Sequence, residues 1–454
     1  MPGSFHNISS LTSALGAFQR AIDVTGSNIA NANTKGYSRR RVDLASNPDL
    51  PYFSRGWQSL GSGVSVSSIN RVRDAFLDRS ASRSQSLSGE AGARASHLAN
   101  LEAILGEPAD EGISKALGKV FDAWASLGAS PNSSAARTSV RSAAETLASA
   151  MRDSYHRIET EKSDASAAAS ADFARINELA GEISSLNSQI ATESSGGSPN
   201  ELLDRRQNAL DELSSLIKIE TTVLPSGVAT VTAAGTNLVD ISRSNPLDSS
   251  FNPANGPVDP NLKAALRGGS LSGHLQGMAD ADGQMAWLDD LALQLKDQFN
   301  AIHTTGKGAD GSTGVSFFSS ATTGAKDLDL SAEIKASAQA IAAGTSGEPG
   351  DGGLAQNLSN LRTQTLAGLN GRTFEGFFND AVLSLGASVR EAQLKSDTES
   401  AVMSQIESQR QSLSGVNLDE EFADMVRLQR SYQAAARALS IADQITEDLL
   451  GIIR

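Results

Sequence analysis

The sequence predicts a mainly α, elongated, multi-domain protein with paired N- and C-terminal coiled-coil helices, a rod-like helical bundle domain and a small β-rich insertion. Apolar residues repeat at heptad spacing at both ends of the chain, and strand-like alternation appears only in its middle. Of the 454 residues, 39% are hydrophobic and 5% aromatic. This composition favours long helices packed through small residues over one thick globular core, and the length suggests several domains.

Each end of the chain carries an apolar seam whose members follow one another at steps of three and four, which places them on one helix face. The large side chains of the predicted seam are Leu11, Leu15, Phe18, Ile22 and Ile29 with Met425, Leu428, Tyr432, Leu439 and Leu449; Thr25, Ala435, Ala442 and Thr446 fill the intervening steps. Residues 1–45 hold five basic and two acidic side chains, whereas residues 415–454 hold seven acidic and four basic ones. Matched seams and opposite charge predict that the two ends pair. Because a lone helix pair buries little, we expect further copies of the chain to cover it.

Between the ends, helical periodicity alternates with turn-rich stretches. KIETTVLPSGVATVTAAGTNLVDIS, beginning at Lys218, has the β-branched alternation and Gly-containing turns of hairpins. We therefore predict three domains. They are a terminal coiled-coil inner domain (1–45 with 406–454), a helical rod domain (46–217 with 275–303 and 354–405) and a small β-rich outer domain (218–274 with 304–353).

No catalytic constellation, metal site or cofactor site is visible. The chain has no cysteine, and its five histidines are scattered without a metal-ligand spacing. GKGADG (306–311) matches the glycine pattern of a dinucleotide loop, but a helix precedes it and a strand follows, which is the reverse of that motif. We predict a hairpin turn there, and a helix-capping role for His303. The acidic run 419–421 is interpreted as complementing a helix dipole.

The net charge of −14 argues against nucleic acid and anionic membranes as partners. Three consecutive arginines, 39–41, leave three interpretations open: a nucleic-acid patch, a contact with carboxylates of a neighbouring subunit, or a solvated helix end. No window approaches 18 apolar residues, so no transmembrane span is predicted, and the first residues lack the features of a cleaved signal peptide.

The stretch NIANANTKGYSRRRVD (28–43) ends the first predicted helix in an unusually specific way. Asparagines tolerate turn conformations, Gly36 allows a turn that a Cβ would obstruct, and Tyr37 offers a flat face with a polar tip. We interpret the stretch as a joint between an inner helical layer and the rest of the subunit. Its members are Asn28, Asn31, Asn33, Thr34, Gly36, Tyr37, Ser38, Arg39 and Arg40.

This stretch resembles the N-terminal signature of the axial proteins of the bacterial flagellum, which comprise the rod, hook and hook-associated proteins. SGVNLDEEFADMVRLQRSYQAAARALSIADQI (414–445) resembles their C-terminal signature. SPNELLDRRQNALDELSSLI (198–217) and the pairing of GYSRR with SGVNLDEE are similar to the hook-associated members. The alternatives are a hook or distal rod protein and, in another class, a secreted effector or enzyme that uses the flagellar export route.

The resemblance implies a non-enzymatic structural adaptor that joins the hook to the filament. Its terminal helices would line a channel, and the chain would be secreted unfolded through the flagellar type III apparatus to the extracellular flagellum. The implied partners are the hook protein, hook-associated protein 3, copies of the chain in a helical ring and a cytoplasmic export chaperone on the C-terminal helix. Many relatives carry a further outer β domain, which we expect to be missing here because residues 306–353 form only a short Gly/Asp-rich run.

Overall fold

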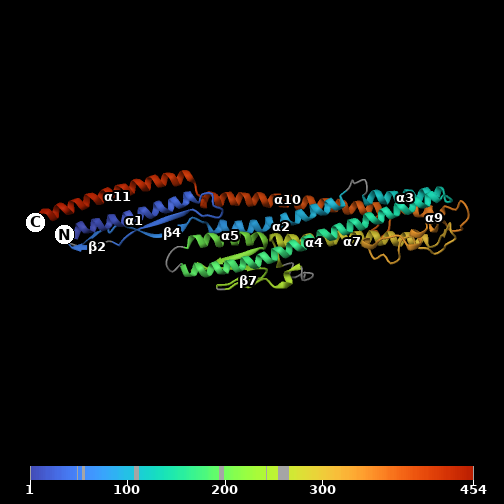
Figure 1. Cartoon of the computed structure of the whole chain (residues 1–454), viewed down its shortest axis with the longest axis horizontal. Helices are drawn as coiled ribbons and strands as arrows, with labels where there is room; N and C mark the ends of the chain where they lie inside the picture. The colour runs from blue at the N-terminus through green and yellow to red at the C-terminus, as the bar shows by residue number, and fades with distance from the viewer. Residues whose placement is uncertain are drawn as a thin grey trace.

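The computed structural model describes residues 2–48, 50–53, 57–106, 112–193, 199–241, 243–253 and 265–452. These residues form one elongated, mainly helical body whose first and last helices lie at the same end (Figure 1). The predicted fold class is confirmed. Paired terminal helices, a helical rod and small sheets are all present.

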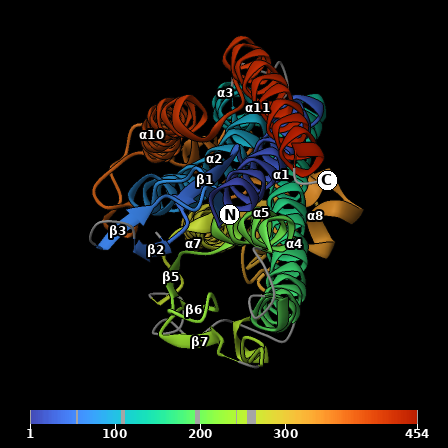
Figure 2. The same ribbon diagram turned by 90° about the vertical axis from the view of Figure 1, so that its left-hand side faces the viewer.

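The terminal end of the molecule is a helix pair. Helix α1 (Pro2–Ala30) packs along α11 (Leu418–Ile452), and Figure 2 looks along the molecule with this pair facing the viewer. Helix α10 (Phe374–Ser414) leads into α11 and runs back along the rod (Figure 1). The chain therefore leaves the terminal end after α1 and returns to it through α10.

Strands follow the first helix. The strand β1 (Arg40–Ser46) pairs antiparallel with β4 (Val64–Arg71), and both contact α1. Between them, β2 (Leu50–Phe53) pairs antiparallel with β3 (Trp57–Leu60). We predicted that the helical rod domain begins at residue 46, whereas the structure forms the strands β2, β3 and β4 between residues 50 and 71. Apolar and polar residues alternate in VSVSSINR, and this pattern favours a strand rather than the helical domain that we predicted there.

The rod is a bundle of long helices that lie nearly parallel (Figure 1). One 60-residue helix, α4, spans roughly 90 Å at 1.5 Å per residue. Asp74 and Thr373 begin their helices with side chains that accept hydrogen bonds from first-turn amides. Besides α10, the rod helices are α2 (Ala75–Leu105), α3 (Ile113–Ala129), α4 (Ser134–Glu193), α5 (Asn200–Leu216) and α7 (Gly269–His303).

The predicted β-rich outer domain is divided between two places. The three-stranded sheet β5 (Ile219–Val223), β6 (Ala229–Ala233) and β7 (Thr236–Val239) packs beside α4 and α5, partway along the rod (Figure 1). Residues 304–353 instead cover the far end of the rod, where Phe317, Phe318 and Ile341 are buried in its core. Only β8 (Lys307–Gly308) and β9 (Ala342–Gly344) form strands there, together with the short helix α8 (Ala332–Ala336), and α9 (Gly353–Asn360) follows. The apolar residues of this segment pack against the rod helices. The many Gly and Asp residues around them had suggested an outer, β-rich position instead.

The described part of the rod contains two main hydrophobic cores, which a polar layer separates, and a small third cluster of Leu186, Ile190 and Leu202 between α4 and α5. The larger core surrounds Trp124 and Phe299 at the far end, and the smaller one lies among α4, α5, α7 and the β5–β7 sheet. Between them, His97 Nδ1 lies 2.7 Å from Glu161 Oε1, and His97 Nε2 lies 2.8 Å from His274 Nδ1. His274 in turn faces Asp172 at 3.6 Å. This polar chain links α2, α4 and α7.

Candidate assembly surface and joint

The predicted seam is present on α1 and α11, but it is only half-buried. Leu11, Leu15, Phe18, Ile22 and Ile29 are all partly exposed, as are Met425, Leu428, Tyr432 and Leu439. The side chain of Leu449 lies outside those that the structure describes. Small residues of the two helices are buried instead: Ala17, Ala21, Thr25 and Ala435. Two helices and a two-stranded ribbon supply too little bulk to enclose the large side chains.

Helix α11 also exposes large apolar side chains outside this seam. Five large apolar side chains of α11 are between 41% and 60% exposed, and they form two groups in which successive members are four residues apart. Spacing of four places each group on one face of the helix. We call this surface the α11 outer stripe; its members are Leu418, Phe422, Val426, Ile441 and Ile445. Exposed apolar side chains in such groups are typical of interaction surfaces.

The joint is organised around the Asn28 side chain, which is 1% exposed. Its amide nitrogen donates to the Arg40 carbonyl and to the Glu421 carboxylate, each at 2.9 Å. Its amide oxygen accepts from the Tyr37 hydroxyl at 2.9 Å and from the Arg40 amide at 3.0 Å. All four hydrogen-bonding positions of the amide are used. One side chain therefore fixes the end of α1, the start of β1 and the first turn of α11.

Arg39 ties the joint to the C-terminal helices. Its guanidinium lies 2.7 Å from Glu421 and 3.0 Å from Glu420, and its backbone amide donates to the Ser414 carbonyl. Glu421 is 2% exposed, so the dipole interpretation of the acidic run is incomplete. Glu421 binds Arg39 and Asn28 within the same chain. None of the three interpretations of residues 39–41 included the contacts that Arg39 makes, because Arg39 pairs with carboxylates of its own chain.

A second cluster joins the strands to the rod through Asp204 of α5. Asp204 accepts from the Ser38 hydroxyl at 2.8 Å and pairs with Arg71 at 3.0 Å and Arg40 at 3.7 Å. Burial lowers the pKa of Arg71, and the Asp204 carboxylate opposes that shift. Arg73 donates to Ser38 at 3.1 Å. These contacts hold the terminal end in a fixed position on the rod.

The turn between α1 and β1 explains the choice of glycine at position 36. Gly36 has a φ of +81°, and a Cβ there would lie 2.1 Å from the Asn208 side chain. Asn31 and Thr34 hydrogen-bond within the turn, Asn33 is exposed, and the Arg40 guanidinium lies 5.0 Å from the Tyr37 ring. The predicted joint residues are thus brought together, apart from Asn33. Their partners Glu421 and Asp204 were not predicted from the sequence, although both belong to the quoted motifs.

The glycine-rich loop GKGADG and His303, the remaining candidates from the sequence, make contacts that stabilise the fold. GKGADG forms a turn closed by the Gly311 amide and the Gly308 carbonyl. His303 is buried; its Nδ1 lies 2.7 Å from the Val315 carbonyl and its Nε2 accepts from the Ala342 amide, so it holds the far-end segment in place and does not cap its own helix. Within the described residues, no group of three or more histidines and carboxylates could hold a metal ion. No helix in the part of the chain that the structure describes is long and apolar enough to cross a bilayer.

Three family profiles match the chain. The profile of the flagella basal body rod protein matches residues 8–37, and the C-terminal profile of the flagellar basal body rod FlgEFG proteins matches residues 403–452. The profile of the helical domain of flagellar hook-associated protein FlgK matches residues 98–318. The first two matches fall on the helices that pair. The chain is therefore an axial protein of the bacterial flagellum, built as a structural subunit.

Comparison with individual proteins shows which of the flagellar axial proteins the chain is similar to. The chain is 28% identical to "Flagellar hook-associated protein 1" of Bacillus subtilis, with 99% of this chain and 98% of that protein covered. It is 26% identical to the protein of the same name from Salmonella typhimurium, covering 97% and 98%. A solved structure, that of the flagellar hook junction protein FlgK from Burkholderia pseudomallei, has a similar fold, with a TM-score of 0.66 at 17% identity over 74% of this chain and 100% of that one. The predicted resemblance to the hook-associated proteins is thus confirmed over nearly the full length of the chain, and it falls on flagellar hook-associated protein 1, the structural protein of the hook–filament junction.

The alignments also bear on the expected missing domain. They extend over 501 and 548 positions, more than the 454 residues of this chain. The relatives therefore contain residues without a counterpart here. Where those residues lie in the relatives stays a prediction.

Proposed function

We propose that copies of this chain join through the α11 outer stripe and the half-buried seam to form a helical ring between hook and filament. The ring is a heterologous, head-to-tail assembly, in which each copy presents different surfaces to its two neighbours. The observation that carries the proposal is the apolar surface that α11 leaves exposed in the single chain, beside a seam on α1 and α11 that is only half-buried. Burial of such surface stabilises an assembly by about 25 cal/mol for each Å² removed from water.

The finer statements extend this proposal. The chain acts without catalysis, is exported unfolded and is located outside the cell in the flagellum. Its neighbours are the hook protein on one side and hook-associated protein 3 on the other. A cytoplasmic export chaperone covers α11 before secretion, because an exposed apolar helix would otherwise promote aggregation.

Deletion of the gene in its source bacterium, followed by electron microscopy, tests the proposal. We expect hooks that end without a filament and filament protein released into the medium. Cells without any hooks would move the role to the hook or rod. Normal flagella would favour the alternative of a secreted effector, for which peptidoglycan cleavage by the purified protein is the direct assay.

A further inference from the structure

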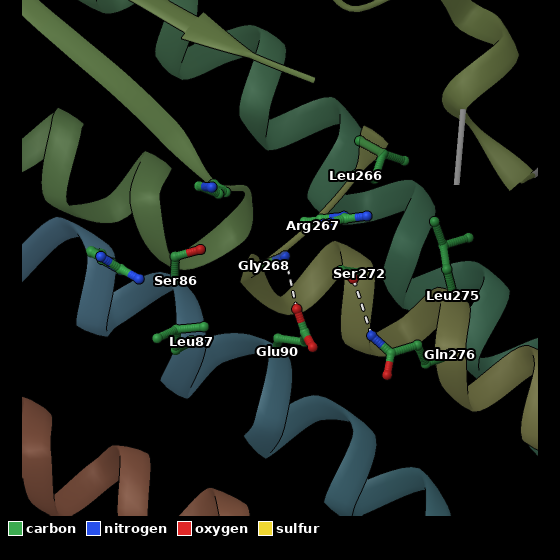
Figure 3. Close-up of a pocket in the computed structure, with 11 residues that line it drawn as sticks. Ser86, Leu87, Glu90, Leu266, Arg267, Gly268, Ser272, Leu275 and Gln276 are labelled. Carbon is green, nitrogen blue, oxygen red and sulfur yellow. Dashed lines mark hydrogen bonds between the residues drawn. The ribbon is translucent and has the colours of Figure 1, made fainter. Parts of the chain in front are cut away.

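A cavity of about 380 Å³ opens on the rod, away from the terminal pair. It lies between α2, the start of α7 and Lys218, which follows α5 (Figure 3). Its volume falls within the range of small-ligand sites. None of the residues that line it belongs to the seam, the joint or the α11 outer stripe.

The wall of this cavity combines apolar side chains with one unsatisfied hydroxyl. Leu87, Leu266 and Leu275 provide the apolar part. Ser86 is 2% exposed and its hydroxyl has no hydrogen-bond partner in the described structure. The hydroxyl points toward Gly268 (Figure 3). A Cβ on Gly268 would lie 2.2 Å from that oxygen, so glycine keeps the space open.

Positive charge surrounds the same space. Arg83 and Lys218 line the cavity, and neither forms an ion pair with a carboxylate among the residues that the structure describes. Arg267 adds a third cation. The nearby Glu90 carboxylate is already engaged, because it accepts from the Gly268 amide at 2.8 Å and lies 3.3 Å from Lys395. This concentration of cations occurs on a chain whose net charge is −14.

We propose that this cavity binds a carboxylate carried on a short aliphatic chain. The carboxylate lies between Arg83 and Lys218, since arginine and lysine donate charge-assisted hydrogen bonds to such groups. The Ser86 hydroxyl donates to the same group and thereby gains the partner that it lacks. The aliphatic chain packs on the leucines. An inorganic anion would satisfy the cations and leave the apolar wall unused.

Calorimetric titration of the full chain with hexanoate tests the site. Hexanol supplies the same apolar body without the charge, and inorganic phosphate supplies charge without the body. We expect saturable binding of hexanoate at one site per chain, about tenfold or more tighter than either comparison compound. Absence of saturable binding at millimolar hexanoate, or equal affinity for phosphate, would overturn the proposal.

Three variants locate the site. Arg83→Gln and Lys218→Gln should each weaken hexanoate binding about three- to tenfold, because each removes one exposed cation. Ser86→Ala should weaken it about threefold without lowering the melting temperature, since the hydroxyl makes no hydrogen bond in the unliganded fold. Arg79→Gln is the matched control: it makes the same charge change on the same helix at a residue that does not line the cavity. An equal loss in Arg79→Gln would mean that binding depends on net charge, which contradicts a specific site.

Two sources carry this chemistry, a free carboxylate and an acidic side chain of a second copy. Sedimentation of the full chain at high concentration, with and without hexanoate, distinguishes them. A mass that falls when hexanoate is added assigns the site to contact between copies. Saturable binding with unchanged mass assigns it to a free ligand.

Discussion

The rod and the terminal pair are both helical, yet they differ in where their large apolar side chains lie. In the rod, Trp124, Phe121 and Phe299 are buried to within 1% of their surface. In the terminal pair, Phe18 and Leu428 are half-buried, and Phe422 is 52% exposed. The same helical spacing therefore builds a closed core in one region and leaves a partly exposed apolar surface in the other. The core around Trp124 is closed within one chain, although α10 of the rod also leaves Leu383 and Leu394 more than 60% exposed. Our proposal is that assembly covers the apolar side chains of the terminal pair.

Between these regions lies a polar joint rather than an apolar core. Asn28, Arg39 and Glu421 hold α1, β1 and α11 together through directed hydrogen bonds. Directed bonds fix orientation more strictly than apolar packing, which is non-directional. Every copy of the chain can thus present its terminal pair at the same angle.

The variant Leu428→Asp should have the largest effect, because it should abolish assembly through the terminal pair and leave the rod folded. A charge at a position that assembly buries is costly, so we expect loss of incorporation into flagella and loss of motility. The rod should keep its circular dichroism spectrum and thermal transition. Leu428→Met conserves volume and should remain motile. Motile Leu428→Asp cells would show that the seam is not an assembly surface.

Truncation of large side chains compares the two regions directly. Trp124→Ala should cost about 3–5 kcal/mol of unfolding free energy, because it leaves a cavity in the rod core. Phe18→Ala in the isolated chain should cost less, about 1–2 kcal/mol, since Phe18 is only partly buried before assembly. Urea unfolding of the purified chain measures both. Similar losses would indicate that the terminal pair is as complete a core as the rod.

The joint should respond to Glu421→Ala with a local effect. The substitution leaves Arg39 and Asn28 without one buried partner, so we expect the joint to open more easily by about 2–3 kcal/mol. Hydrogen exchange in residues 28–41 and 414–421 measures this opening. Glu420→Ala, at a carboxylate whose side chain is 59% exposed, is the control and should change it by at most about 1 kcal/mol. Equal exchange in both variants would remove Glu421 from its assigned role.

Helix order, seam positions and the joint stretch could be predicted from sequence because they depend on local spacing and turn chemistry. The strands along α1 could not, since their pairing joins residues 40–46 to residues 64–71 across an intervening ribbon. The partners of Asn28 and Ser38 were missed for the same reason. Glu421 and Asp204 lie 393 and 166 positions away along the chain. Periodicity identifies a face of a helix but carries no information about what covers it.

The smallest expected effect concerns the polar layer that interrupts the rod core. Burial lowers the pKa of His274, so the folded chain resists protonation there and stability falls as the pH drops below about 6.5. Burial raises the pKa of Asp172, which faces the same histidine. Protonation of this carboxyl therefore increases the free energy of unfolding as the pH falls toward about 4, the ordinary pKa of an aspartate. The two effects oppose each other, and we expect a shallow pH dependence between pH 4 and 6.5 in the unmodified chain.

Asp172→Asn removes the compensating group while keeping an oxygen for the Ser270 hydroxyl. The variant should therefore lose stability more steeply than the unmodified chain below about pH 6.5, with a slope approaching 1.4 kcal/mol per pH unit for one proton. His274→Gln leaves only Asp172 and should instead gain stability as the pH falls. Urea unfolding at several pH values measures both slopes. His156→Gln, at an exposed histidine outside the layer, should follow the unmodified chain. Parallel curves for all four proteins would mean that the polar layer binds no proton on folding, and the rod would then behave as uniformly as an apolar core.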